Sequence, residues 1–98
     1  MNERLYLALD QGGHATRAII FDATGDTRAQ SYAPVATVRT ASAQVEHDPE
    51  QLCESLEVAI SDACQQVTSS GDLVAAGLAT QRSSIVCWDR TSGAALSP

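Results

Sequence analysis

A long amphipathic segment flanked by apolar runs is the feature that most constrains the fold of this chain. Apolar residues recur along it at helical spacing, on one stripe formed by Leu52, Leu56, Ala59/Ile60, Ala63 and Val67,. An apolar run from Leu5 to Leu9 precedes the segment, and another from Leu73 to Ala79 follows it. Both runs read as buried strands. A strand, a helix and a second buried strand in this order predict a parallel pairing.

The ends of the helix are marked by residues that favour caps. Asp48 suits the N-cap, Pro49 suits the first helical position, and Gln51 has the spacing of a capping box,. Gly71 follows Ser69 and Ser70 and suits the C-terminal cap,. We therefore expect the helix to run from about residue 49 to about residue 70.

The part of the chain before the helix predicts an antiparallel meander. The apolar run ends on Asp10, and Gln11 to His14 are predicted to form a turn, because paired Gly12 and Gly13 allow positive φ,. Strands are expected from Thr16 to Phe21 and from Thr27 to Ala33, joined by a turn around Gly25,. Residues 34–44 are read as a loop or an irregular extended stretch, with no strand assigned to them. A last short strand is expected from Ile85 to Trp88, with a turn from Asp89 to Gly93.

Composition narrows the function classes. The chain has 98 residues, a formal net charge of -6 and no Lys. An acidic chain with scattered Arg does not suit a nucleic-acid surface. Without Lys, neither a Walker A loop nor a Schiff-base mechanism is available in this segment. The sequence shows neither a membrane-spanning apolar run nor a signal-peptide layout.

The three cysteines, Cys53, Cys64 and Cys87, are widely spaced and form neither a zinc pattern nor a complete disulfide set,. We expect them to be reduced, buried packing residues in a cytoplasmic protein.

Three ordered motifs carry a family resemblance. The stretch from Leu9 to Asp22, LDQGGHATRAIIFD, is similar to the opening signature of the FGGY carbohydrate kinase family, in particular its glycerol kinase-like members. The segment from Val45 to Pro49, VEHDP, resembles the family's sequence before its first long helix. Thr80-Gln81-Arg82, followed by Val86 to Asp89, resembles its substrate-side loop and the next strand.

The resemblance implies an α/β chain with the ribonuclease H-like fold of actin and hexokinase-type ATPases. Residues 1–98 would form the N-terminal part of the N-terminal domain of a longer, two-domain enzyme. That enzyme would transfer a phosphoryl group from ATP, with Mg²⁺, to a hydroxyl of a sugar or polyol. The catalytic base is expected beyond residue 98, so this segment alone is expected to be inactive. The resemblance leaves open whether the protein forms a homo-oligomer.

The first motif supplies the expected ATP phosphate site, formed by Asp10, Gly12, Gly13, His14 and Arg17. Asp10 is the expected magnesium ligand, because Mg²⁺ prefers carboxylates and retains several waters. The glycines allow the backbone N–H groups to approach phosphate oxygens closely. The family usually has hydroxyl residues, most often Thr, at the positions of Gly13 and His14. This departure affects phosphate chemistry more than it affects the fold.

The third motif supplies the expected substrate contacts, Arg82 and Ser83. The Arg82 guanidinium has donors suited to vicinal hydroxyls. Glycerol kinase-like relatives carry Glu where Ser83 stands, so the substrate is predicted to be a sugar or polyol, with glycerol itself in doubt. Thr80 and Gln81 are read as structural, and Trp88 is read as core.

Glu46, His47 and Asp48 resemble a metal or catalytic cluster but are read as the entry to the helix, with Asp48 as the cap,. The alternative to a kinase is a non-catalytic sugar- or nucleotide-binding relative with the same fold, which Gly13 and His14 favour. An actin-like chaperone ATPase is a weaker alternative, because the third motif belongs to the sugar side of FGGY proteins.

Overall fold

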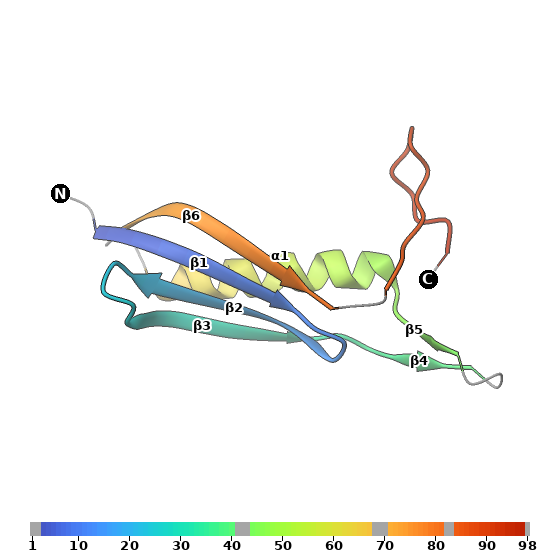
Figure 1. Ribbon diagram of the computed structural model, residues 1–98, viewed down its shortest axis with the longest axis horizontal. Helices are drawn as coiled ribbons and strands as arrows, with labels where there is room; N and C mark the ends of the chain where they lie inside the picture. The colour runs from blue at the N-terminus through green and yellow to red at the C-terminus, as the bar shows by residue number, and fades with distance from the viewer. Residues whose placement is uncertain (1–2, 41–43, 68–70, 82–83, 98) are drawn as a thin grey trace.

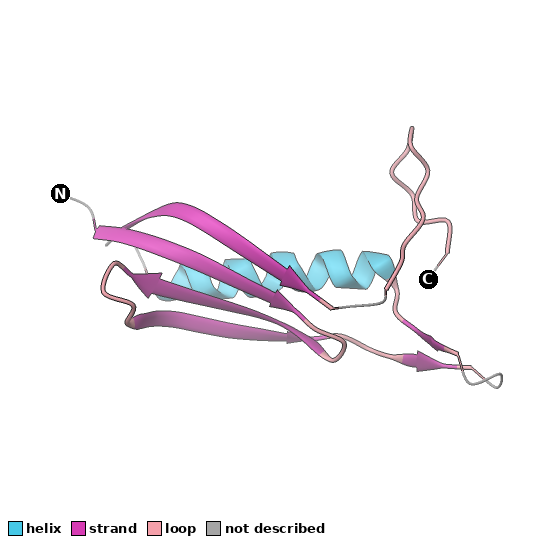
Figure 2. Cartoon of the chain, in the orientation of Figure 1, coloured by secondary structure: helices cyan, strands magenta, loops and turns pink. Residues whose placement is uncertain are grey.

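The computed structural model describes residues 3–40, 44–67, 71–81 and 84–97. The elements are β1 (Glu3–Gln11), β2 (Ala15–Asp22), β3 (Thr27–Pro34), β4 (Val38–Arg39), β5 (Val45–Glu46), α1 (Pro49–Gln66) and β6 (Gly71–Thr80). Figure 1 shows one helix lying along a sheet, and Figure 2 shows the C-terminal segment leaving that sheet as a loop.

The main sheet has the strand order β3-β2-β1-β6. β1 pairs antiparallel with β2, from Leu5 opposite Asp22 to Gln11 opposite Thr16. β1 also pairs in parallel with β6, which ends with Gln11 beside Thr80. The predicted meander, long helix and parallel strand are therefore confirmed. The carboxyl ends of β1 and β6 and the start of α1 lie at the same end of the molecule (Figure 1).

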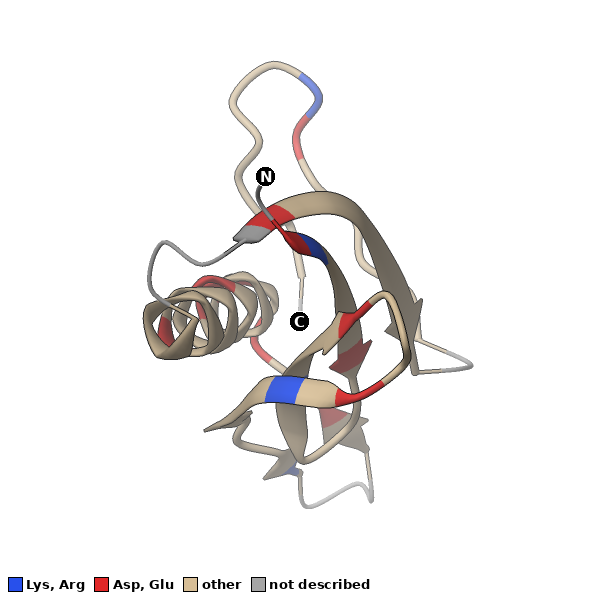
Figure 3. Cartoon of the chain, turned by 90° about the vertical axis from the view of Figure 1, so that its left-hand side faces the viewer, with Lys and Arg blue, Asp and Glu red and all other residues tan. Residues whose placement is uncertain are grey.

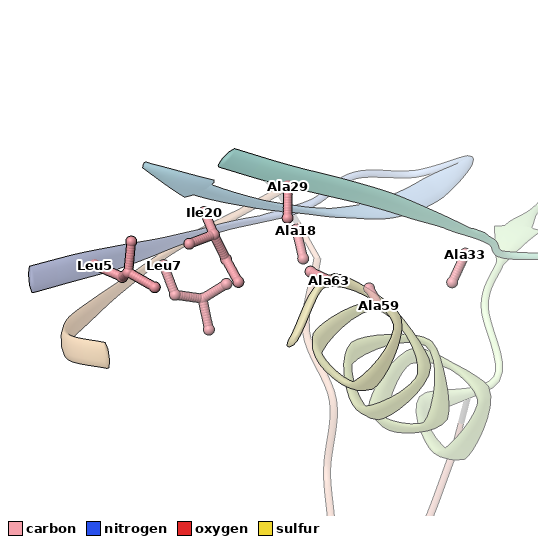
Figure 4. Packing of buried hydrophobic residues seen from close by; sticks show 8 residues of the cluster. All are labelled: Leu5, Leu7, Ala18, Ile20, Ala29, Ala33, Ala59 and Ala63. Carbon is pink, nitrogen blue, oxygen red and sulfur yellow. The ribbon is translucent and has the colours of Figure 1, made fainter. Parts of the chain in front are cut away.

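The core lies between α1 and one face of the sheet, mainly over β2 and β3. It consists of Leu5, Leu7, Ala18, Ile20, Ala29, Ala33, Ala59 and Ala63 (Figure 4). Ala59 and Ala63 are completely buried on the helix, opposite alanines of the strands. Small side chains on both sides allow the helix to lie close to the sheet, so there is little free volume.

The helical stripe is centred on smaller residues than the sequence pattern predicts. Ser55, Ala59 and Ala63 are the buried residues of α1, while Leu52 and Leu56 are only partly buried. Ser55 is tolerated because its hydroxyl lies 2.6 Å from the hydroxyl of buried Thr16 and donates to the Leu52 carbonyl. Buried hydroxyls with partners avoid the cost of an unpaired polar group.

The caps of α1 agree only in part with the prediction. Asp48 is the N-cap, and its Oδ1 accepts the Glu50 N–H at 3.0 Å. Gln51 does not close a capping box, because its side chain accepts the Ala36 N–H at 2.9 Å instead. The helix ends at Gln66 with Val67 as the C-cap, so the prediction of Gly71 as the cap is wrong. Gly71 is the first residue of β6.

The C-terminal predictions need more correction. No strand forms from Ile85 to Trp88 in the described residues; Trp88 makes an isolated bridge to Ala95. The turn from Asp89 to Gly93 is confirmed, since the Gly93 N–H donates to the Asp89 carbonyl at 2.8 Å. Trp88 is 61% exposed and is not a core residue of this chain. The segment pairs with no strand of the described main sheet.

The cysteines are not all buried as predicted. Cys53 and Cys87 are exposed, Cys64 is partly buried, and all three are free. Cys53 lies outside the buried stripe of α1, and Cys87 lies on the C-terminal loop. Only Cys64 packs against the core.

Residues 34–44, left unassigned above, include β4, which pairs antiparallel with β5 through Val38 opposite Glu46. This small ladder extends beyond the sheet next to the start of α1 (Figure 1). A two-residue strand carries too little periodicity to be recognised in a sequence.

β6 forms where a strand was predicted, but the prediction that this strand is buried is wrong for this chain. All of its residues from Asp72 to Thr80 are exposed, including Leu73, Val74 and Leu78. It stands at the end of the strand order, so its outer edge is unpaired within the described sheet. α1 does not reach it, because the helix lies over β2 and β3.

Acidic residues occur on the helix, the strands and a turn, with basic residues scattered between them (Figure 3). No helix in the described part of the chain is long and apolar enough to cross a membrane.

The close approach of α1 to the sheet predicts that Ala63→Leu lowers the free energy of unfolding by about 1–3 kcal/mol, because the larger side chain must displace its neighbours. Urea denaturation measures this change. Ser61→Leu, on the exposed side of the same helix, should change stability by no more than about 0.5 kcal/mol,. Equal effects of the two substitutions would contradict the packing described here.

Candidate functional site

The turn between β1 and β2 is the centre of the candidate site. The Gly12 N–H donates to the Ala15 carbonyl at 2.9 Å and closes the hairpin, with Gly13 and His14 at its tip. The predicted turn is present, but neither Gly12 nor Gly13 uses positive φ; among the described glycines, Gly25 and Gly93 adopt it. The paired glycines have no side chains, so a ligand can approach the backbone of the turn closely.

The carbonyl groups of this turn all have donors. The Gly12 oxygen accepts from Gln11 Nε2 at 2.9 Å, and the Gly13 oxygen accepts from the Thr37 hydroxyl at 3.2 Å. The His14 oxygen accepts the Val35 N–H at 2.8 Å. Among the described residues, by contrast, no partner engages the N–H groups of Gly13 and His14. The turn therefore presents two main-chain donors, an arrangement suited to an anion.

Asp10 and Arg17 are cross-strand partners, two residues outside the Gly12–Ala15 turn on each strand. Both side chains are exposed, and they lie on the face opposite α1, since the neighbouring residues Gln11 and Thr16 are buried on the helix side. No ion pair joins them among the described residues. Asp10 thus offers an unpaired carboxylate at the carboxyl end of β1.

A cavity of about 340 Å³ lies on the helix side of the same strand ends. Its lining comes from β1, β5, α1, the end of β6 and the chain after it. The lining residues are Gln11, Val45, Glu46, His47, Pro49, Leu52, Thr80, Gln81, Ser84, Ile85 and Val86. The Gln81 N–H donates to the Gln11 carbonyl at 3.0 Å and extends the β1–β6 pairing into the cavity wall. The volume is within the range of small-ligand sites.

His47 and Gln81 link the cavity to the turn. A Cβ atom built on Gly13 would lie 3.4 Å from Gln81 Oε1 and 3.8 Å from His47 Nε2. The other ring nitrogen of His47 hydrogen-bonds the Ala36 carbonyl at 3.2 Å. The sequence assigned Glu46, His47 and Gln81 to structure alone. The structure confirms Asp48 as the cap and places the other three residues in the cavity wall.

Arg82 and Ser83, the predicted substrate residues, lie outside the described residues. Their neighbours on either side, Gln81 and Ser84, both line the cavity. Within the described residues there is no cluster of His, Cys, Asp and Glu suited to a metal ion.

Hydrogen bonds lower the pKa of two carboxyl groups at other turns. A hydrogen bond from the Thr24 hydroxyl, supported by the N–H groups of Asp26 and Thr24, lowers the pKa of Asp22. The N–H groups of Ser92 and Thr91 lower the pKa of Asp89. These carboxylates stabilise their own turns and take no part in the cavity.

Comparison with known sequences now identifies the relatives of this turn and cavity. The sequence profile described as "FGGY family of carbohydrate kinases, N-terminal domain" matches residues 5–98. This chain belongs to the FGGY family. Glycerol kinase of Francisella philomiragia is 33% identical over 94 residues, covering 95% of this chain and 19% of that protein. Glycerol kinase 2 of Pseudomonas aeruginosa is 36% identical over 93 residues, covering 94% of this chain and 18% of that protein.

Solved structures show the same fold. Glycerol kinase of Plasmodium falciparum, crystallised with ADP, superposes with a TM-score of 0.91 at 19% identity, over 97% of this chain and 19% of that one. Gluconate kinase of Lactobacillus acidophilus superposes with a TM-score of 0.88 at 21% identity, over 98% of this chain and 19% of that one. This FGGY chain thus spans about a fifth of the length of its relatives.

The geometry of Gly13 predicts that it tolerates a side chain. Gly13→Ala should leave the free energy of unfolding unchanged or raise it by up to about 1 kcal/mol, because the contacts of the new Cβ are ordinary and φ is not left-handed,. Gly25→Ala is the matched control. Its φ of 89° should make the same change cost about 1–2 kcal/mol,. Denaturant unfolding measures both; a larger loss at Gly13 than at Gly25 would contradict the described turn.

Proposed function

We propose that this FGGY chain supplies the phosphate-binding turn and part of the sugar site of an ATP-dependent kinase that phosphorylates a hydroxyl of a sugar or polyol. The single observation that carries the proposal is the arrangement of the turn. Its three carbonyl groups accept hydrogen bonds from Gln11, Thr37 and Val35, which leaves the N–H groups of Gly13 and His14 as donors. Phosphoryl transfer depends mainly on positioning and on charge neutralisation, and fixed main-chain donors provide both.

Asp10 and Arg17 fit the remaining charges of a nucleotide phosphate. The Asp10 carboxylate is exposed and without an ion-pair partner among the described residues, which suits Mg²⁺ held through one carboxylate and waters,. Bound Mg²⁺ would neutralise phosphate charge as it develops. The Arg17 guanidinium, directly across the ladder, suits a phosphate oxygen,. ATP and Mg²⁺ are therefore the proposed cofactors.

The cavity is the proposed sugar subsite. Hydroxyl groups need both donors and acceptors, and Gln11, Glu46, His47 and Gln81 provide these in its wall,. In the sequence, Arg82 and Ser83 lie between Gln81 and Ser84, which both line the cavity. This position supports their proposed contact with the substrate. The cavity lies next to Gly13, so a hydroxyl bound there would be close to a phosphate held by the turn.

We also propose that residues 1–98 form the N-terminal part of a two-domain enzyme whose catalytic base lies beyond residue 98. The support is that this chain matches only about a fifth of each relative. The exposed apolar residues of β6 are consistent with a strand that the rest of a domain would cover.

The proposed reaction is tested with the protein that carries this chain. ATP consumption is measured against a panel of sugars and polyols, including glycerol and gluconate. Stimulation by at least one hydroxyl compound, with one phosphorylated product for each ADP formed, is expected. ATP consumption that no compound stimulates would exclude the kinase proposal for the panel's substrate classes.

Replacing the carboxylate of Asp10 tests its proposed role. Asp10→Asn should lower kcat by about 100-fold or more, because the amide cannot replace a charged magnesium ligand. The free energy of unfolding should change by no more than about 0.5 kcal/mol, since the side chain is exposed,. Asp72→Asn, on the neighbouring strand, is the matched control and should retain activity. Full activity of Asp10→Asn would contradict the proposal.

A non-catalytic sugar- or nucleotide-binding relative is the second candidate. Gly13 and His14 favour it, because they stand where the family usually has hydroxyl residues. Calorimetry separates the two candidates: sugar binding without ATP binding would support the sensor, and binding of both with turnover would support the kinase.

A further inference from the structure

The connection between β3 and β4 hydrogen-bonds the carbonyl groups of the β1–β2 turn, the proposed phosphate site. No sequence motif singled out the residues of this connection. Val35 donates its N–H to the His14 carbonyl at 2.8 Å, and the Thr37 hydroxyl donates to the Gly13 carbonyl at 3.2 Å. Thr37 is partly buried and stands 24 residues from Gly13 in the sequence. Two consecutive carbonyls of the turn are therefore held by one distant segment.

That segment is itself fixed from its other side. The Ala36 N–H donates to Gln51 Oε1 at 2.9 Å, and His47 Nδ1 donates to the Ala36 carbonyl at 3.2 Å. Both partners belong to α1 or to the residues just before it. Val35 is buried, with 6% of its surface exposed. Hydrogen bonds to the turn and to the start of α1 therefore fix the backbone that carries the Thr37 hydroxyl.

A trans peptide is planar, so its C=O and N–H groups point in opposite directions. The chain has no cis peptide among the described residues. Holding the Gly13 carbonyl therefore aims the His14 N–H away from Thr37. Gly13 has no Cβ to resist rotation of this peptide, so the orientation depends on the hydrogen bond.

We propose that Thr37 is a positioning residue that fixes the Gly13–His14 peptide and so aims the His14 N–H at a nucleotide phosphate. The inference rests on the proposed function of the turn. Thr37 acts through the peptide and does not touch the substrate. Its effect is specific to one donor, because Gln11 Nε2 holds the preceding peptide through the Gly12 carbonyl and thereby aims the Gly13 N–H.

The first test examines the full-length protein that carries this chain, without ligand, by NMR of ¹⁵N-labelled protein in a weakly aligning medium. Thr37→Val removes the hydroxyl at nearly constant volume, and Thr37→Ser retains it. The residual dipolar coupling of the His14 amide should shrink in Thr37→Val, because the peptide samples more than one orientation, and should be retained in Thr37→Ser. The Gly13 amide coupling should stay unchanged in both, which general loosening of the fold would not allow.

Thr27→Val is the matched control. Thr27 is an exposed residue of β3 far from the turn, and this change should leave both amide couplings as they are. An unchanged His14 coupling in Thr37→Val would overturn the positioning role, whatever the chain binds.

The second test titrates the same variants with Mg-ADP and follows the Gly13 and His14 amide shifts. Thr37→Val should raise Kd by roughly threefold to tenfold, the equivalent of one neutral hydrogen bond. Thr37→Ser should stay within about twofold of the parent. An unchanged Kd in Thr37→Val, with normal binding by the parent, would overturn the link between Thr37 and phosphate. No amide response in the parent, with the coupling difference intact, would overturn the proposed phosphate role of the turn and leave the positioning of the peptide established.

Discussion

The position of β1 between an antiparallel and a parallel neighbour is the constraint on which the rest of the structure depends. The β2 side brings Arg17 opposite Asp10, and the β6 side brings Thr80 beside Gln11. A parallel neighbour requires a crossover, which places α1 on one face and its start at the carboxyl ends of β1 and β6,. The turn and the cavity both lie at this end, because β1 pairs with β2 on one side and with β6 on the other. Asp10 and Gln11 then face opposite sides of the sheet. The Asp10 carboxylate is exposed to solvent, and Gln11 lines the cavity.

The turn shows how main-chain groups become a binding surface. Donors for its three carbonyls come from the turn's own strand and from the segment after β3. Once those oxygens are engaged, the N–H groups of Gly13 and His14 are what the turn presents. Two glycines add little to this chemistry except access, because neither adopts a left-handed backbone. Neither Gly13 nor His14 carries a hydroxyl group, so the proposed phosphate binding would depend on the backbone and on the groups that orient it.

Prediction from the sequence succeeded for elements that a local pattern of residues marks. The strands of the meander, the N-cap Asp48 and the parallel strand after the helix were all predicted, since periodicity, capping and crossover rules each depend on neighbouring residues,. It failed where the partner is distant. Ile85 to Trp88 looks like a strand, but no described strand lies beside it. Gln51 has the spacing of a capping box, yet Ala36 offers its side chain another donor.

The sequence by itself determined the family, the order of the main-sheet strands and the helix, and the residues of the proposed phosphate turn, because each depends on contiguous residues. Only the tertiary structure decided what surrounds that turn. Thr37, His47 and Gln81 come from three separate segments, and none belongs to a pattern that predicts contact with Gly13. Sheet pairing and the path of the chain after β3 bring them together. Such contacts depend on the three-dimensional course of the backbone, which local spacing in a single sequence does not record.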